Sequence, residues 1–260
     1  MIKCPICNSL TSFLIQKKDR FDQKYDYFRC ENCRFLFEKD LVEHSEYLAK
    51  KVSNLYRKNY FDDIDSGWKM RGDEFLKFFQ PLLSLYKFLS FKKNISVLDY
   101  GGGNGYIASK LAQDFTVLYY DKYDNPKIAG NYTILEKPQN TDVTCAVELV
   151  EHIADIKEWD FLKELSPDIF VFTTGLSDNI TKEEILDWPY LNPDFGHTAL
   201  YSCQSLYILG KKYGYIYLFF PNISYHMFFK NKILSKINFV FFEYFIYNIL
   251  RMIKKYYYGK

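Results

Sequence analysis

The feature that most constrains this chain is a mostly apolar segment that runs directly into a glycine-rich turn. Residues 95–98 are followed by Asp99, and four of the five residues 101–105 are glycine. Beyond the turn, over residues 106–112, apolar and small side chains recur four positions apart, which is the spacing of a helix. The pattern predicts a strand, a tight turn and a helix.

Glycine is needed where the backbone takes a positive φ or lies directly against a ligand. A turn that leads into a helix N-terminus favours a ligand with negative charge. A dinucleotide site would have G-x-G-x-x-G, but Tyr106 occupies the third glycine position. The residues instead form D-x-G-x-G-x-G, with Asp99, Gly101, Gly103 and Gly105. The alternative is a turn that only joins a strand to a helix.

This motif resembles the first motif of the class I S-adenosylmethionine-dependent methyltransferases. The resemblance implies that the glycine turn packs under the amino-acid part of the cofactor, with Asp99 at the strand end beside it. It also implies a Rossmann-like, mostly parallel, seven-stranded sheet. Predicted strands that alternate with helical segments independently favour a mostly parallel sheet with helices on both faces.

Asp121 follows the β-rich run 115–120 and lies 22 residues after Asp99. A strand-end acid at this distance can accept hydrogen bonds from both ribose hydroxyls of an adenosine. We therefore predict that Asp121 binds the cofactor ribose, with a simple turn acid as the alternative.

Glu148 begins an acid-x-x-acid-His run, 148–152, after another β-rich segment. This run resembles the segment after strand four in small-molecule methyltransferases. Ligands of open α/β sheets bind outside the carboxyl ends of the strands, so these residues should line the crevice. We expect Glu148 to contact the cofactor and His152 to point towards the substrate. A helix N-terminal turn is the alternative for Glu151 and His152.

His197 lies in a G-H-x-x-x-Y-S segment, 196–202, after the predicted fifth strand. This segment and the Pro-bounded loop 187–193 resemble bacterial methyltransferases of sugar and surface-polysaccharide pathways, which carry an N-terminal zinc module. A hydroxyl acceptor benefits from a general base, and the pKa of imidazole suits that role. We favour His197 slightly as this catalytic base, with His152 next; a structural or binding role is the alternative for both.

The segment before the first strand is aromatic and charged. Apolar residues at helical spacing follow Gly72, whose acidic neighbours are typical of a helix start. Related methyltransferases often carry a tyrosine-rich segment here that closes over the cofactor. The resemblance makes Tyr60 and Arg71 candidates for binding the cofactor carboxylate, with a purely structural role in a helical lid as the alternative.

Cys4, Cys7, Cys30 and Cys33 form two C-x-x-C pairs separated by 22 residues. Two such pairs can close a tetrahedral shell around zinc and leave no position for water, so the ion should be structural. Disulfides and a redox C-x-x-C are the rival readings. A chain with no secretory signal argues against the first, and two matched pairs argue against the second. The remaining cysteines, Cys145 and Cys203, are interpreted as buried thiols.

The overall charge of +2 does not favour a nucleic-acid-binding protein. The absence of a signal segment and of a long uncharged apolar run predicts a cytoplasmic protein with no transmembrane helix. Residues 211–260, however, hold nine Lys or Arg and one acid. The apolar tail is expected to be helical. Packing on the core or in a homodimer is the favoured interpretation, because a helix that is apolar all round is usually buried. Peripheral contact with an anionic membrane and framing of an anionic substrate are the alternatives.

We therefore predict a zinc ribbon at 1–42, a helical connector or lid at 43–94, a methyltransferase core at 95–220 and an aromatic, basic helical segment at 221–260. The predicted activity is methyl transfer from S-adenosylmethionine to a small acceptor, namely a sugar, a nucleotide-sugar or a phosphorylated intermediate of surface-glycan synthesis. O-methylation is favoured over C-methylation. The alternatives are an RNA methyltransferase and a non-catalytic zinc-ribbon binding protein on a methyltransferase scaffold.

Overall fold

The computed structural model describes residues 2–56, 67–178, 180–181, 183–220 and 224–230. The chain divides into two compact units. The first unit comprises residues 1–66, 148–164 and 171–228, and the second comprises 67–147, 165–170 and 229–260. Neither unit is continuous in sequence, because the chain passes between them several times.

The main sheet has seven strands in the order β10-β11-β8-β7-β4-β5-β6. The strands are β4 (Ser96–Tyr100), β5 (Thr116–Tyr120), β6 (Thr133–Ile134), β7 (Val143–Ala146), β8 (Ile169–Thr173), β10 (Tyr215–Phe220) and β11 (Tyr225–Lys230). The pairs β4–β5, β4–β7 and β5–β6 are parallel. From β4 the chain first adds strands on one side and then, at β7, on the other, so the strand order reverses beside β4. This is the predicted Rossmann-like, mostly parallel sheet with helices, and β4 is its switch point.

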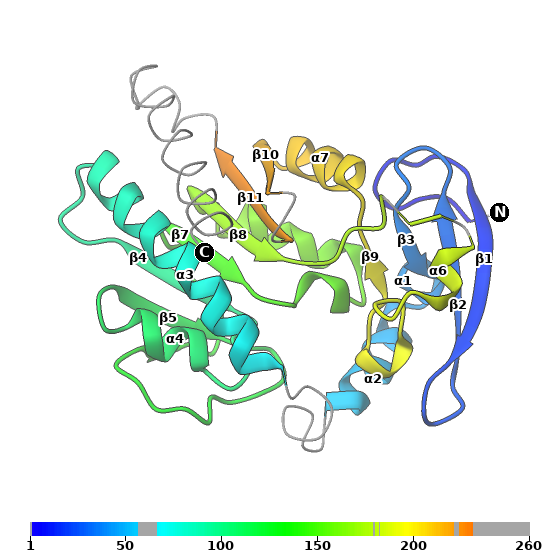
Figure 1. Ribbon diagram of the computed structural model, residues 1–260, viewed down its shortest axis with the longest axis horizontal. Coiled ribbons are helices and arrows are strands. Elements are labelled where there is room, and N and C mark those ends of the chain that lie inside the picture. Colours follow the sequence, from blue (N-terminus) through cyan, green and yellow to red (C-terminus); the bar gives the residue numbers. More distant parts are fainter. Residues whose placement is uncertain (1, 57–66, 179, 182, 221–223, 231–260) are drawn as a thin grey trace, which may run out of the picture. The chain divides into compact units, whose positions relative to one another are not determined.

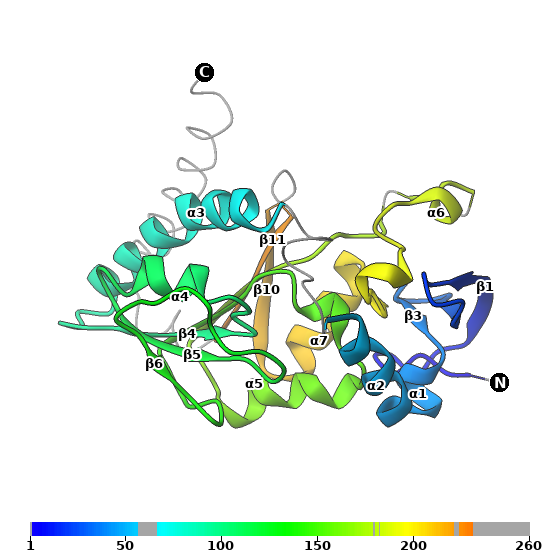
Figure 2. The same cartoon turned by 90° about the horizontal axis from the view of Figure 1, so that it is seen from below.

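In the second unit, α3 (Trp68–Leu89) and α4 (Tyr106–Leu111) lie on the same side of β4 and β5, as Figure 2 shows. The start expected at Gly72 is wrong, because α3 begins four residues earlier. Gly72 is instead an internal contact point. A Cβ placed there would lie 2.9 Å from a ring carbon of Tyr106, so glycine lets α3 approach α4 closely.

The first unit contains a second sheet of four strands, β1-β2-β3-β9. The strands are β1 (Thr11–Lys18), β2 (Lys24–Cys30), β3 (Leu36–Glu38) and β9 (Ala199–Leu200), and all three pairings are antiparallel. β1 and β2 form an antiparallel hairpin between the two cysteine pairs. Figure 1 shows β9 beside β3, so a segment from late in the chain completes the N-terminal sheet.

The other helical elements are short, apart from two. They are α1 (Asp40–Glu43), α2 (Ser45–Tyr56), η2 (Val150–His152), η3 (Ile156–Asp160), α5 (Phe161–Glu164), α6 (Glu184–Asp187), η4 (Pro193–Phe195) and α7 (Cys203–Lys212). Ser202 caps α7 by accepting a hydrogen bond from the Ser205 N–H.

The expectation of a helical C-terminal segment is wrong for residues 225–230, which form β11. Five of these six residues are buried, and the strand lies between β8 and β10. Aromatic and bulky side chains are common in such a central strand. A short sequence that is apolar at every position is equally compatible with a buried helix. Most of the predicted tail, and with it the membrane and dimer hypotheses, lies outside the described residues. No helix among the described residues is long and apolar enough to cross a membrane.

Candidate functional site

The glycine turn joins β4 to α4 and has the backbone geometry that its sequence requires. Gly101, Gly103 and Gly105 have φ values of 73°, 53° and 83°, in the left-handed region that favours glycine. Gly105 is also the N-cap of α4. The strand, turn and helix predicted around residues 95–112 are therefore present. The role of the three glycines in binding S-adenosylmethionine stays a prediction.

Asp99 is buried at the end of β4, and its Oδ2 accepts a hydrogen bond of 3.0 Å from the Ala108 N–H. This bond ties the strand to the helix across the glycine turn. Burial raises the pKa of Asp99 to about 7, and the charge of Asp121 adds to the effect, while the bond from Ala108 opposes it. Asp99 is thus a supporting group of the turn as well as a candidate cofactor residue.

Asp121 lies directly beside the turn. Its Oδ2 accepts a hydrogen bond of 2.9 Å from the Gly103 N–H. Its Oδ1 accepts from the N–H groups of Tyr123 and Asp124, at 2.8 and 2.9 Å. The structure therefore brings Asp121 to the glycine motif, as its spacing predicts. Both of its oxygens already accept main-chain hydrogen bonds, and its ribose-binding role stays a prediction.

Gly102, which the D-x-G-x-G-x-G pattern leaves out, is needed for a different reason. A Cβ at this position would lie 2.6 Å from a ring carbon of Tyr119 and 2.8 Å from Asp99 Oδ2. The Tyr119 hydroxyl in turn donates to the Gly103 carbonyl oxygen at 2.6 Å. The tyrosine that braces the turn thus leaves no room for a side chain. The only sequence signal was the unbroken run of three glycines.

Of the two candidates from the connector, one lies among the described residues and one does not. Arg71 lies in the first turn of α3 and is half-buried. Tyr60 lies outside the described residues. Their roles at the cofactor carboxylate stay predictions.

A second cluster, in the first unit, contains the acids and histidines of the predicted substrate side. Glu148 has a φ of 50°, an uncommon conformation for a residue other than glycine. Thr173 holds it there. The Thr173 hydroxyl accepts from the Glu148 N–H and donates to Glu148 Oε1, both at 2.8 Å. Glu148 follows β7 by two residues, which fits a position at the carboxyl end of that strand.

Glu151 is completely buried, and the Tyr190 hydroxyl donates a hydrogen bond to its Oε1. Burial and the neighbouring Glu148 carboxylate raise the pKa of Glu151 well above its ordinary value. Tyr190 belongs to the Pro-bounded loop 187–193, which the sequence singles out. Glu151 also lies in the first turn of η2, as the alternative of a helix N-terminal turn predicts, and its carboxyl group is buried beside Tyr190.

His152 and His197 lie next to each other, with ring centroids 4.8 Å apart. Nδ1 of His197 is 2.6 Å from the Tyr190 carbonyl oxygen, and Nδ1 of His152 is 3.3 Å from that of Gly196. A carbonyl oxygen can only accept, so each Nδ1 carries the hydrogen of its bond and a neutral ring keeps its lone pair on Nε2. The two histidines chosen from sequence are thus brought together, with the nitrogen that could accept a proton defined in each.

The four N-terminal cysteines converge at the end of the β1–β2 hairpin. Their sulfur atoms all lie within 4.8 Å of one another, with Cys4 Sγ 3.6 Å from Cys33 Sγ and Cys7 Sγ 3.4 Å from Cys30 Sγ. Sulfurs on a tetrahedral zinc ion are about 3.8 Å apart, given Zn–S bonds of about 2.3 Å. The donor set and its spacing fit a small zinc ribbon. Of the other cysteines, Cys145 is buried as expected, but Cys203 is only half-buried, at the start of α7.

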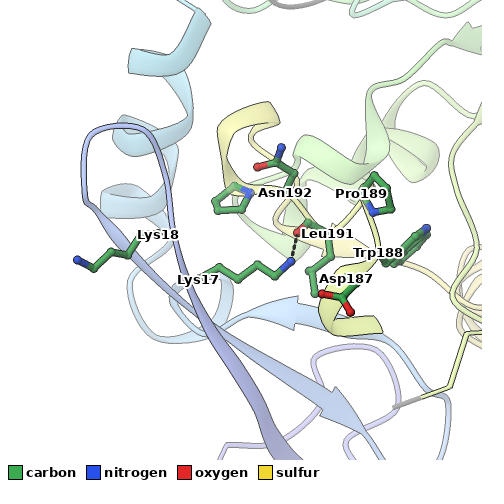
Figure 3. Close-up of a pocket in the computed structure, with 8 residues that line it drawn as sticks. Lys17, Lys18, Asp187, Trp188, Pro189, Leu191 and Asn192 are labelled. Carbon is green, nitrogen blue, oxygen red and sulfur yellow. Dashed lines mark hydrogen bonds between the residues drawn. The ribbon is translucent and has the colours of Figure 1, made fainter. Parts of the chain in front are cut away.

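A groove of about 350 Å³ lies on the first unit, between the end of β1 and the loop 187–193. Figure 3 shows the side chains that line it. Its lining residues are Lys17, Lys18, Asp187, Trp188, Pro189, Leu191, Asn192 and Pro193. The Lys17 ammonium donates to the Leu191 carbonyl oxygen at 2.9 Å, which anchors the loop to the hairpin. Trp188 of this loop lines the groove, and Tyr190 of the same loop contacts Glu151 and His197. The two rings lie 5.3 Å apart.

Comparison with known proteins agrees with this geometry. A family model described as a methyltransferase domain matches residues 73–218. The 1,6-didemethyltoxoflavin-N1-methyltransferase of Burkholderia thailandensis, solved with bound 1,6-didemethyltoxoflavin and S-adenosylhomocysteine, is 12% identical, with a TM-score of 0.50. The match covers 78% of this chain and 93% of that one. No curated protein sequence matches the chain.

Two further solved structures have lower TM-scores. Magnesium protoporphyrin IX methyltransferase from Synechocystis PCC 6803, with bound S-adenosylmethionine, is 12% identical over 74% of this chain and 98% of that one, at a TM-score of 0.41. A small RNA methyltransferase is 16% identical over 58% of this chain and 25% of that one, at a TM-score of 0.40.

The sheet order and the glycine turn define a class I methyltransferase fold. The family model spans more than half of the 260 residues, so the chain belongs to the methyltransferase-domain family. Its enzyme class is that of the S-adenosylmethionine-dependent methyltransferases.

Proposed function

We propose that this protein transfers the methyl group of S-adenosylmethionine to a hydroxyl of a small carbohydrate-related or phosphorylated acceptor in surface-glycan synthesis. The observation that carries the proposal is the pairing of His152 with His197 beside a buried acid. Such a cluster suits an acceptor that must lose a proton. The glycan pathway rests on the resemblance of the loop 187–193 and the segment 196–202 to enzymes of that kind.

The cofactor half of the proposal rests on the second unit. Bound S-adenosylmethionine would supply an electrophilic methyl group on its sulfonium. Gly101, Gly103 and Gly105 leave a main-chain surface without side chains, against which the amino-acid part can pack. Asp121 offers a carboxylate beside the same turn for the ribose hydroxyls.

The acceptor half rests on the first unit. An imidazole Nε2 of His197 or His152 would take the proton of the acceptor hydroxyl. His197 is the favoured base, because its Nδ1–H is fixed by the 2.6 Å bond to Tyr190 and its orientation is better defined. A positive charge that forms on the ring would favour the ionised form of the neighbouring Glu151 and would so oppose the rise of its pKa that burial causes.

The test begins with calorimetric titration of S-adenosylmethionine and S-adenosylhomocysteine, followed by turnover assays on nucleotide-sugars and sugar phosphates. His197→Ala and His152→Ala should bind the cofactor with unchanged affinity, and one of them should lose about 100-fold or more in kcat. His44→Ala, at an exposed histidine of the same unit, is the matched control. Folded protein with no affinity for either compound would overturn the proposal. If the protein methylated RNA and none of the sugar acceptors, the proposed carbohydrate-related acceptor would be wrong and RNA would take its place.

We further propose that Cys4, Cys7, Cys30 and Cys33 hold one structural zinc ion. A closed shell of four thiolates leaves no position for a substrate, so the ion would stabilise the hairpin rather than take part in methyl transfer. Elemental analysis of Cys4→Ser should show one zinc per chain fewer than the wild type, whereas Cys203→Ser should match it. This proposal would be contradicted if the protein were stably folded while these four cysteines bound no metal.

A further inference from the structure

Three potential metal ligands meet in the first unit, away from the four cysteines. A carboxylate oxygen of Glu151 and one ring nitrogen each of His152 and His197 lie within 4.8 Å of one another. Glu151 is completely buried, His197 is 6% exposed and His152 is half-buried. The cluster therefore has a closed side formed by Glu151 and His197, and a side at His152 that solvent or a small ligand can reach.

Only one oxygen of the buried Glu151 carboxyl group is hydrogen-bonded to the described residues. Oε1 accepts from the Tyr190 hydroxyl, but Oε2 is buried and has no hydrogen-bond partner among the residues that the structure describes. A buried carboxyl oxygen without a partner is unfavourable, because the hydrogen bonds that it made to water in the unfolded chain are not replaced. An atom in this state calls for a partner, and a cation at the centre of the cluster would supply one.

The two imidazoles are oriented as metal ligands usually are. In metal sites, the ring nitrogen that does not bind the ion commonly donates to a carbonyl or a carboxylate, which fixes the tautomer and the ring orientation. Here Nδ1 of His197 bonds to the Tyr190 carbonyl and Nδ1 of His152 to the Gly196 carbonyl. Tyr190 thus supports two of the three groups, through its carbonyl for His197 and its hydroxyl for Glu151.

We propose that Glu151, His152 and His197 bind a divalent transition-metal ion, with zinc as the reference ion, at a second metal site. Two imidazoles and one carboxylate form a common ligand set for ions of this class and leave one or more positions open. Ligand atoms on a tetrahedral zinc ion are about 3.4 Å apart, given bonds of about 2.1 Å, so the three ligand atoms would have to approach one another by about 1.4 Å at most. The positive ion would also offset the repulsion between Glu151 and its neighbour Glu148.

The catalytic role of this metal site rests on the proposed function, whereas metal binding at the site does not. An acceptor hydroxyl that occupies the open position would have its pKa lowered by the ion and would lose its proton to water. With the ion bound, His152 and His197 act as ligands and not as proton acceptors. Metal binding itself is measured without cofactor or acceptor. A chain with no affinity for S-adenosylmethionine could still carry the site, and the reverse also holds.

The test counts metal ions on the full-length protein. Wild-type protein is saturated with zinc and desalted, and its metal content is measured. We expect two zinc ions per chain, one removed by the Cys4→Ser change and the other by His152→Ala or Glu151→Gln. His44→Ala and Cys203→Ser should keep both. His152 is half-buried, so its alanine variant should fold even if changes at Glu151 or His197 prevent folding.

Cobalt distinguishes the two sites spectroscopically. The cysteine site should give a thiolate-to-cobalt charge-transfer band in the near ultraviolet, whereas the second equivalent should add only weak visible bands. Tyr190→Phe removes the hydroxyl that holds Glu151, and should raise the Kd of the second ion by about 10- to 100-fold. Saturation of the wild type at a single ion held by the cysteines would overturn the proposal. So would a second ion that persists with wild-type affinity in His152→Ala.

Discussion

The hydroxyl of Tyr27 donates a hydrogen bond of 2.8 Å to the carbonyl oxygen of His197. Tyr27 lies on β2, the inner strand of the cysteine-bearing hairpin, and is completely buried. The main chain at the favoured catalytic histidine is therefore held by the N-terminal sheet. The same connection is made by β3 and β9, where Leu36 pairs with Leu200. The cysteine-bearing N-terminal segment is thus part of the support of the candidate site.

The first prediction concerns this bond. Tyr27→Phe leaves the His197 carbonyl without its buried donor, and should lower the free energy of unfolding by about 1–3 kcal/mol. If the bond positions His197, kcat should also fall while the Kd for S-adenosylmethionine stays unchanged. Urea unfolding, turnover and calorimetry measure the three quantities.

Tyr25→Phe is the matched control for Tyr27→Phe. Tyr25 lies on the same strand and is equally buried, but its hydroxyl donates to Asp19 at 3.3 Å and not to the histidine segment. It should lose stability with little change in kcat. Equal effects of the two substitutions on kcat would show that the Tyr27 bond has no particular role in positioning His197.

The second prediction concerns Ser202, whose Oγ donates to the Cys33 carbonyl oxygen and accepts from the Ser205 N–H. Ser202→Ala removes the cap of α7 and should cost about 1–2 kcal/mol. It also releases the cysteine loop, so zinc should transfer to a competing chelator faster than from the wild type. Ser177→Ala is the control, because that buried hydroxyl bonds to Tyr201 and not to the cysteine loop. Equal zinc-release rates in both variants would count against the link.

The sequence was most informative where one local motif imposes one backbone geometry. The glycines at 101, 103 and 105 required positive φ, and the spacing of Ile107 and Leu111 required a helix, so β4, the turn and α4 were predictable. The two C-x-x-C pairs likewise predicted the convergence of the cysteines. In the first case, residues close in sequence carry the geometry. In the second, a shared ligand chemistry links two pairs that are 22 residues apart.

What the sequence could not reveal depends on pairings between distant segments. Nothing local indicated that Leu200 pairs with Leu36, or that Tyr190 covers Glu151, because these contacts are fixed by the packing of whole elements. The pattern of β11 was misread for a related reason. A short run that is apolar on every side fits a buried helix and a central strand equally well.

The third prediction concerns Asp99, whose pKa is raised to about 7 in the folded protein from 3.8. Between these two values the folded state binds more protons than the unfolded state, so this group makes stability fall as pH rises from 4 to 7. Asp99→Asn keeps an oxygen for the Ala108 N–H and removes the charge. Above pH 7 it should therefore be more stable than the wild type, by roughly 4 kcal/mol at most.

Urea unfolding of wild type and Asp99→Asn at several pH values between 5 and 8 measures this difference. The gain should shrink as pH falls, because the wild-type carboxyl then becomes neutral. Groups that titrate in both proteins cancel in the comparison. A difference that stays constant across the range would mean that Asp99 does not carry a buried charge at neutral pH.

The fourth prediction concerns His226 on β11, which is buried between rings. Its Nε2–H donates to the Thr174 carbonyl oxygen at 3.0 Å, its Nδ1 accepts from the Tyr217 hydroxyl at 2.9 Å, and its ring stacks on Phe219 with an interplanar angle of 7°. Burial lowers the pKa of His226 to about 4 from 6.5, and the bond to Thr174 opposes this only partly.

Between pH 6.5 and 4, His226 is therefore protonated in the unfolded state but neutral in the folded state. The stability that this group contributes is complete above pH 6.5 and is lost as the pH falls towards 4. His226→Gln should be less stable than the wild type at pH 7.5, because the stacked ring is gone. The deficit should narrow by roughly 3 kcal/mol at most as pH approaches 4. Urea unfolding of both proteins, with His44→Gln as the exposed control, measures it. A deficit that is independent of pH would show that His226 takes up its proton equally well in the folded and unfolded chains.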